Sequence, residues 1–211
     1  MASLMSVHEA QQNILAAFSP VSTTTVNVAS AGGWVLAQDV ITDIELPPFA
    51  NSSMDGFAVR AADLEAATSH KPVILQVITD IPAGVVPEVS ILPGQTARIM
   101  TGAPLPDGAD AVVPIEETSS ANDNNNLKIP DQVKVFRPVE SGAFVRPRGQ
   151  DVQIGQLALS AGIRLTPQDL GLLASLGISQ VPVYRKPRLA LFATGDELIN
   201  PDLPLAPGKI R

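Results

Sequence analysis

Four oxygen-bearing side chains stand in stiff turns or directly after strand-like segments, where they could line one cleft. They are Asp55, Thr101, Asp151 and Glu197. Carboxylates and a hydroxyl can accept hydrogen bonds, and together they could surround a divalent cation, which prefers oxygen ligands. The chain contains no cysteine, which excludes thiolate catalysis and cysteine-ligated metal sites.

Asp55 has the most constrained surroundings of the four. The chain reaches it through a proline-stiffened apolar stretch, Leu46-Pro-Pro-Phe49, and a small polar turn, residues 51–53. Gly56 follows, and then a strand-like Phe57-Ala58-Val59. Proline fixes the backbone on one side and glycine relaxes it on the other, so the loop holds one carboxylate in place. An ordinary Asp-Gly turn explains the same residues without any function.

Thr101 and Asp151 each have a functional and a purely structural interpretation. Thr101 follows the strand-like residues 97–100 and precedes Gly102-Ala103-Pro104, so its hydroxyl either serves a site or only caps that turn. Asp151 follows two arginines, Arg146 and Arg148, and could belong to a site or to a surface ion pair.

Glu197 ends the segment Thr194-Gly195-Asp196-Glu197, which follows an apolar run at 188–193. We expect that run to form a buried parallel strand, with a helix starting at Thr194. The loop is then either a capping box, in which Thr194 and Glu197 only start the helix, or an anion site at the carboxyl end of a strand. Only fourteen residues follow Glu197, too few to complete such a domain, so we expect the chain to be either a fragment or the product of a truncated reading frame.

Four further acidic residues, Asp107, Asp110, Glu116 and Glu117, have a weaker claim to a function. The sequence Asp107-Gly108 is typical of a turn, and the others fit a solvated face. Convergence around a divalent cation is the alternative, and spacing does not decide between them.

Composition limits the fold and the partners. With 211 residues, 45% hydrophobic, the chain is long enough for one or two domains with real cores. Nineteen prolines, fifteen glycines and only 4% aromatic residues favour short strands and turns. The net charge of −7 argues against nucleic acid and anionic membrane surfaces. No apolar run reaches the ~20 residues of a membrane span, and no lysine or arginine precedes Arg60. We therefore expect a soluble, cytoplasmic protein.

Local patterns predict two helices and several short strands. A capping box at Ser6 and Glu9 starts the first helix, and Thr166, with a proline after it, starts the second. Residues 33–45 are expected to form a strand with a bend, and residues 118–126 a polar hairpin tip. Short strands are predicted at 73–78, 97–100, 111–113 and 133–136.

Three long motifs in this order carry a resemblance: residues 46–60, residues 98–113 and residues 191–198. They are similar to the molybdopterin molybdenumtransferase family, whose eukaryotic relatives include the gephyrin E domain. The resemblance covers essentially the whole chain, but only about the first half of a full family member. It departs from the family pattern at Gln150, where glutamate is usual, and at Phe144, where asparagine is common.

The resemblance implies an α+β fold in three parts. Residues 1–45 and 146–186 would form a discontinuous α/β domain that links and dimerises. Residues 46–145 would form an inserted β-rich domain, and residues 187–211 the truncated start of an α/β domain that binds molybdopterin.

The resemblance also implies a reaction, the insertion of molybdate into adenylated molybdopterin with release of AMP, dependent on Mg²⁺ and carried out by an elongated homodimer. Asp55, Thr101, Asp151 and Glu197 match family active-site positions, and Thr194, Gly195 and Asp196 match its anion-handling loop. We expect this chain alone to be an incomplete, inactive portion. The alternative is a non-catalytic dimerisation or scaffold module.

Overall fold

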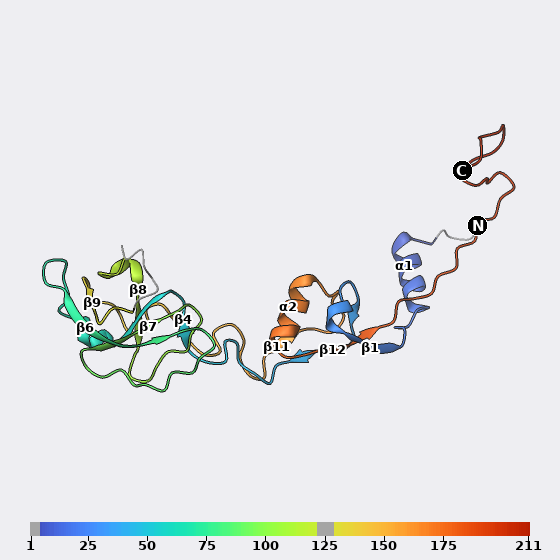
Figure 1. Cartoon of the computed structure of the whole chain (residues 1–211). Coiled ribbons are helices and arrows are strands. Elements are labelled where there is room, and N and C mark those ends of the chain that lie inside the picture. Colours follow the sequence, from blue (N-terminus) through green and yellow to red (C-terminus); the bar gives the residue numbers. More distant parts are fainter. Residues whose placement is uncertain (1–4, 122–128) are drawn as a thin grey trace.

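The computed structural model describes residues 5–121 and 129–211, and it is elongated, with two lobes in a row. Figure 1 shows a β-rich lobe at the left, a second lobe with α2 in the middle, and α1 with the C-terminal segment at the right. The helices are α1 (Val7–Ala16) and α2 (Pro167–Ser175). The strands are β1 (Thr23–Asn27), β2 (Val35–Leu36), β3 (Val40–Ile41), β4 (Asn51–Ser52), β5 (Gly56–Val59), β6 (Val73–Ile81), β7 (Gln95–Ile99), β8 (Ala111–Pro114), β9 (Gln132–Val135), β10 (Val145–Arg146), β11 (Leu157–Leu159) and β12 (Gln180–Tyr184).

The β-rich lobe is built on a five-stranded sheet in the order β8-β5-β7-β6-β9. β6 and β7 are parallel, and the other neighbours are antiparallel. All four residues of β5 are buried, because the sheet carries an apolar core on each face. Phe57 and Val59 belong to one core and Ala58 to the other, as alternation along a strand requires. The strands predicted between residues 73 and 136 are all present.

The second lobe packs α2 beside an antiparallel sheet in the order β1-β12-β2. Thr166 caps α2, and its hydroxyl and backbone N–H both donate to the Asp169 carboxylate, which confirms the predicted start of this helix. Residues 33–45 form two short strands, β2 and β3, which belong to different sheets. The predicted bend is therefore a break between two strands.

Two stretches of chain that are far apart in sequence run together where the β-rich lobe begins. β4 pairs antiparallel with β10, so that Ser52 lies opposite Val145. Leu46 forms a further antiparallel bridge with Val152. The chain thus enters and leaves this lobe through neighbouring, hydrogen-bonded segments.

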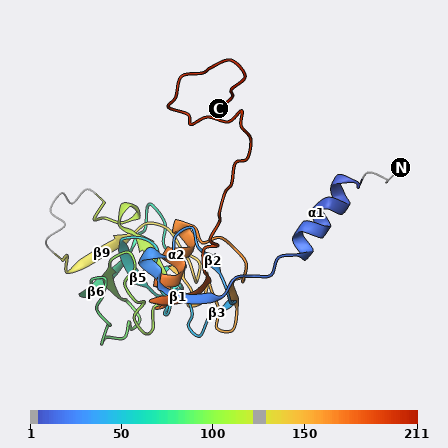
Figure 2. The same cartoon turned by 90° about the vertical axis from the view of Figure 1, so that its right-hand side faces the viewer.

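The two ends of the described chain project away from both lobes, as Figure 2 shows from a second direction. The helix α1 begins at the predicted capping box of Ser6 and Glu9. None of its residues is buried, so its apolar side chains face solvent.

The prediction of a buried strand at 188–193 is wrong. The segment is extended but pairs with no strand in the described chain, and the Leu191 and Phe192 side chains are 97% and 89% exposed. A helix does not start at Thr194 either; residues 194–197 lie in a loop closed by a bridge between Leu198 and Ile210. The apolar run had indicated burial, but a strand forms only where a neighbour satisfies its backbone.

In the part of the chain that the structure describes, neither helix has the length and apolar character needed to cross a lipid bilayer. Of the predicted polar loop, residues 118–121 form a turn, and residues 122–126 lie outside the described residues.

Candidate functional site

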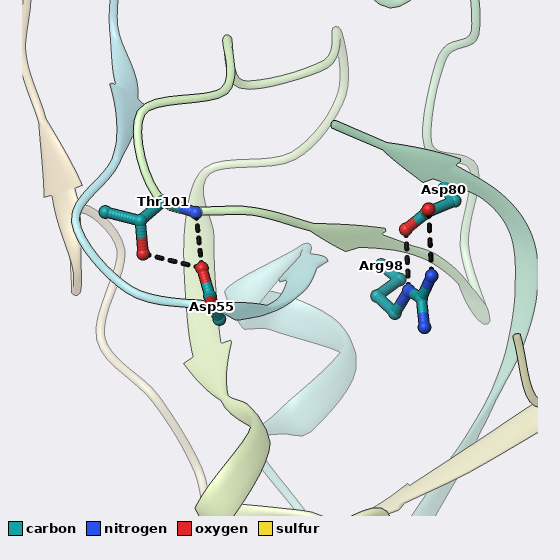
Figure 3. Close-up of polar contacts among 4 residues, drawn as sticks. All are labelled: Asp55, Asp80, Arg98 and Thr101. Atoms are coloured by element: carbon teal, nitrogen blue, oxygen red, sulfur yellow. Dashed lines mark hydrogen bonds and ion pairs between the residues drawn. The ribbon is translucent and has the colours of Figure 1, made fainter. Parts of the chain in front are cut away.

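The structure brings Asp55 and Thr101 into direct contact. The backbone N–H and the hydroxyl of Thr101 both donate to Asp55 Oδ1, each at 2.6 Å. Figure 3 shows Asp55 on the loop before β5 and Thr101 just beyond the end of β7. The Thr101 hydroxyl therefore bonds a carboxylate from another motif, rather than capping its own turn.

Backbone hydrogen bonds join the loop that carries Asp55 to the turn that carries Thr101 on either side of this contact. Ser52 N–H donates to the Ala103 carbonyl at 3.0 Å, and Gly102 N–H donates to the Ser52 carbonyl at 2.8 Å. Leu105 N–H donates to the Ala50 carbonyl at 3.0 Å. The loop that carries Asp55 and the turn that carries Thr101 thus form one hydrogen-bonded unit.

Two glycines are required by this geometry. A Cβ atom on Gly56 would lie 2.1 Å from the Val113 carbonyl oxygen, so no other residue fits beside Asp55 without a backbone shift. Gly102 has φ +81° in the tight turn that Ala103 N–H closes on the Met100 carbonyl. Positive φ at this position of a turn favours glycine.

Hydrogen bonding favours the ionised form of Asp55. The Thr101 hydroxyl first, and then the Thr101 backbone N–H, hold the pKa of the Asp55 carboxyl below its ordinary value. The side chain is exposed, and no hydrogen bond to its Oδ2 atom comes from the described residues. The site offers a fixed, charged oxygen to solvent, suited to binding a cation or a hydrogen-bond donor and unsuited to acting as an acid at neutral pH.

The other predicted residues do not join this pair. Asp151 is exposed, and its side chain makes no hydrogen bond or ion pair within the described residues; Arg148 pairs with Glu45 instead. The alternative interpretation of Asp151 as an ion-pair partner is therefore wrong. Glu197 lies in the C-terminal segment at the opposite end of the chain from the β-rich lobe, together with Thr194, Gly195 and Asp196 (Figure 1).

The four additional acidic residues do not form a cation site. In the described ranges, no three histidine, cysteine or carboxylate side chains are grouped to hold a metal ion. Asp110 accepts a hydrogen bond from the Ala61 N–H at 2.7 Å. Glu117 forms an ion pair with Arg137. These carboxylates serve local structure.

Sequence reasoning missed an ion pair next to the Thr101 turn. Arg98 Nε lies 2.6 Å from Asp80 Oδ1, and the two side chains are only 11% and 24% exposed. The available signal was Arg98 itself, because an arginine flanked by apolar residues in a strand needs a partner. Which acidic residue supplied it depended on a strand pairing that the sequence did not show.

A cavity of about 710 Å³ lies on the second lobe, away from Asp55. Its lining includes Trp34, Tyr184 and Arg164, and Lys186 Nζ stands 5.0 Å from the centre of a Trp34 ring. None of the residues predicted to act in the site lines this cavity.

Comparisons with known proteins agree with the resemblance. Residues 5–177 match the family described as "MoeA N-terminal region (domain I and II)". Molybdopterin molybdenumtransferase 2 of Mycobacterium tuberculosis H37Rv is 40% identical over 207 residues, which cover 98% of this chain and 49% of that protein. The molybdopterin molybdenumtransferase of Bacillus subtilis 168 is 44% identical over 176 residues, or 83% of this chain and 40% of that protein.

A solved structure has the same fold. The crystal structure of the molybdopterin biosynthesis MoeA protein from Pyrococcus horikoshii OT3 matches 98% of this chain and 52% of its own, with a TM-score of 0.85 and 35% identity. The chain spans about half the length of the curated relatives it matches. Sequence and fold agree over nearly all of the residues present, and the chain belongs to the MoeA family, of which it represents the N-terminal region.

Proposed function

We propose that the Asp55–Thr101 pair forms part of the active site of a molybdopterin molybdenumtransferase, which inserts molybdate into adenylated molybdopterin and releases AMP. The observation that carries the proposal is the convergence of two family motifs on one carboxylate oxygen at 2.6 Å. Backbone hydrogen bonds between the two loops, together with Gly56 and Gly102, hold this contact in place. An ordinary surface turn does not require such a network.

The ionised Asp55 carboxylate would bind and orient the substrate. With Oδ1 held by Thr101, Oδ2 is the atom left to accept a hydrogen bond or to contact a cation. An exposed single carboxylate fits Mg²⁺, which proteins bind through one or two carboxylates together with substrate phosphates. Mg²⁺ when bound would offset the charge of the phosphate oxygens that leave with AMP. The sulfur that receives molybdenum belongs to the cofactor, so the absence of cysteine is compatible with the reaction.

The remaining predicted residues complete the proposal. Asp151 and Glu197 would contribute carboxylates, and residues 194–196 would handle the anion. The β-rich lobe, which carries Asp55, and the C-terminal segment, which carries Glu197, lie at opposite ends of the elongated chain, so a second copy would bring both into one site. This supports an elongated homodimer.

The arrangement of lobes supports a division into domains at the proposed boundaries: 1–45 with 146–186 for dimerisation, 46–145 as the inserted domain, and 187–211 as the beginning of the pterin-binding domain. The proposed reaction has small, charged substrates, and we place it in the cytoplasm.

Isothermal titration of the chain with adenylated molybdopterin, in the presence of Mg²⁺, tests the proposal. Asp55→Asn removes the charge at nearly constant shape and is expected to weaken binding by about 10-fold or more, since hydrogen bonds to a charged group contribute roughly 1.5–3 kcal/mol. Asp63→Asn is the matched control, because Asp63 also accepts a backbone N–H in the same lobe, from Gly94 at 2.9 Å. Equal affinity of the wild type and Asp55→Asn would contradict the proposal. Self-association without any pterin binding would favour the scaffold alternative.

A further inference from the structure

The ion pair between Asp80 on β6 and Arg98 on β7 has a two-point geometry. Arg98 Nε donates to Asp80 Oδ1 at 2.6 Å, and a terminal guanidinium nitrogen donates to Oδ2 at 2.9 Å. Figure 3 shows the two side chains facing each other, apart from the Asp55–Thr101 contact. A two-point contact fixes the relative orientation of two strands as well as their distance.

The pair stands where the pairing of β6 with β7 is irregular. The regular register runs through Val77 opposite Thr96, is then interrupted, and resumes with Asp80 opposite Arg98 and Ile81 opposite Ile99. Between these paired positions β6 carries two residues, Ile78 and Thr79, where β7 carries only Ala97, so the backbone ladder is locally disrupted. The Asp80–Arg98 pair lies at the first paired position after the break, where it adds a side-chain contact between the two strands.

This register sets the position of the Thr101 turn. Met100 N–H donates to the Ile81 carbonyl at 3.1 Å, so the end of β6 holds the first residue of the turn. On its other side, β7 pairs with β5, where Gly56 lies opposite Ile99. Asp55 precedes β5 directly, and Thr101 follows β7 after one residue. The two strands and their pairing thus determine how closely Thr101 approaches Asp55.

We propose that Asp80 and Arg98 are positioning residues, which hold the end of β7 so that the Thr101 N–H and hydroxyl both reach Asp55 Oδ1. The link to catalysis rests on the function proposed above, whereas the effect on Asp55 does not. A two-point ion pair on a central strand can hold the end of β7 in place, because a partly buried guanidinium keeps one orientation. An exposed, flexible ion pair does not keep one orientation.

The test is the titration of the Asp55 carboxyl by carbon-13 NMR in variants of the chain. Asp80→Asn keeps the shape and removes the charge, and Arg98→Lys keeps the charge and loses the two-point geometry. In both we expect the Asp55 pKa to rise toward its ordinary value, because the hydrogen bonds from Thr101 lengthen. Glu117→Gln is the matched control: it breaks the ion pair with Arg137 in the same lobe, and it should leave the Asp55 titration unchanged.

An unchanged Asp55 titration in a folded Asp80→Asn or Arg98→Lys variant would overturn the positioning role. If neither variant folds, the pair is a requirement of the sheet as a whole, and the proposal is equally overturned.

Titration of the same variants with adenylated molybdopterin separates this inference from the proposed function. A shifted Asp55 pKa with unaltered pterin affinity would leave positioning intact and count against the function. If the Asp55 pKa is unshifted in these variants while pterin binding still depends on Asp55, the positioning role is overturned and the proposed function stands.

Discussion

The contact between Asp55 and Thr101 allows a quantitative test by a double-mutant cycle. Thr101→Val removes the hydroxyl donor at nearly constant shape and leaves the backbone N–H on Asp55 Oδ1 in place. Asp55→Ala removes the acceptor. If the hydroxyl and the carboxylate interact, the double variant loses less free energy of unfolding than the two single variants together.

The expected coupling free energy follows from the geometry and the exposure of the pair. A hydrogen bond to a charged group contributes roughly 1.5–3 kcal/mol when it is shielded from solvent. Both side chains here are exposed, and screening reduces such interactions to about 1 kcal/mol or less. Only one of the two hydrogen bonds is removed, so we expect a coupling free energy of about 1 kcal/mol.

Urea unfolding of the four proteins at neutral pH measures this coupling, with unchanged dependence on denaturant as the check that each variant unfolds in the same way. Thr101→Ser keeps the hydroxyl and should behave like the wild type. Additive effects, within about 0.3 kcal/mol, would refute the inferred interaction. The coupling should also decline in acid, where the carboxylate is protonated.

Three further predictions concern stability. Gly56→Ala should destabilise the chain by about 3 kcal/mol in urea unfolding, because its Cβ would meet the Val113 carbonyl; a loss below about 1 kcal/mol would contradict that close approach. Gly171→Ala should stabilise it by about 0.5–1 kcal/mol, since Gly171 lies inside α2 with nothing within 4 Å of an added Cβ, and a lower melting temperature would speak against this. The lowered pKa of Asp55 means that the folded state binds fewer protons than the unfolded state, so its stabilisation is present above the ordinary aspartate range and lost as the pH falls below about 4. Asp55→Asn should flatten the acid limb of the stability profile, and an unchanged limb would count against the assignment.

Local signals in the sequence were sufficient for much of the fold. Ser6 and Thr166 cap the two helices as predicted, because a capping hydrogen bond involves residues only three positions apart. Most strands of the β-rich lobe were also found from runs of β-branched and apolar residues between turn residues. The exceptions are β4, which lies where a polar turn was predicted at residues 51–53, and β10, which was not predicted. The run at 188–193 misled the same reasoning, because apolar composition indicates burial but cannot supply the neighbouring strand that burial requires.

The candidate site was predictable only in part. The sequence identified Asp55 and Thr101 separately, and it was the motif resemblance that suggested a shared pocket. The structure places the two residues in contact at 2.6 Å, and the shared pocket stays a prediction. The Asp80–Arg98 pair was missed because it depends on a parallel pairing with a register break, which no local pattern encodes. For Asp151 the nearby arginines suggested an ion pair, but Arg148 pairs with Glu45 instead.

The paired crossing of β4 and β10 has a consequence for handling this protein. Residues 51–52 pair with residues 145–146, so the segment by which the chain enters the β-rich lobe lies next to the segment by which it leaves. This lobe is at the left in Figure 1. A gene segment covering that lobe would encode a piece whose two ends are already adjacent, so a short bridge could join them at little entropic cost. Such a piece is suited to excision, circular permutation or grafting into another host protein.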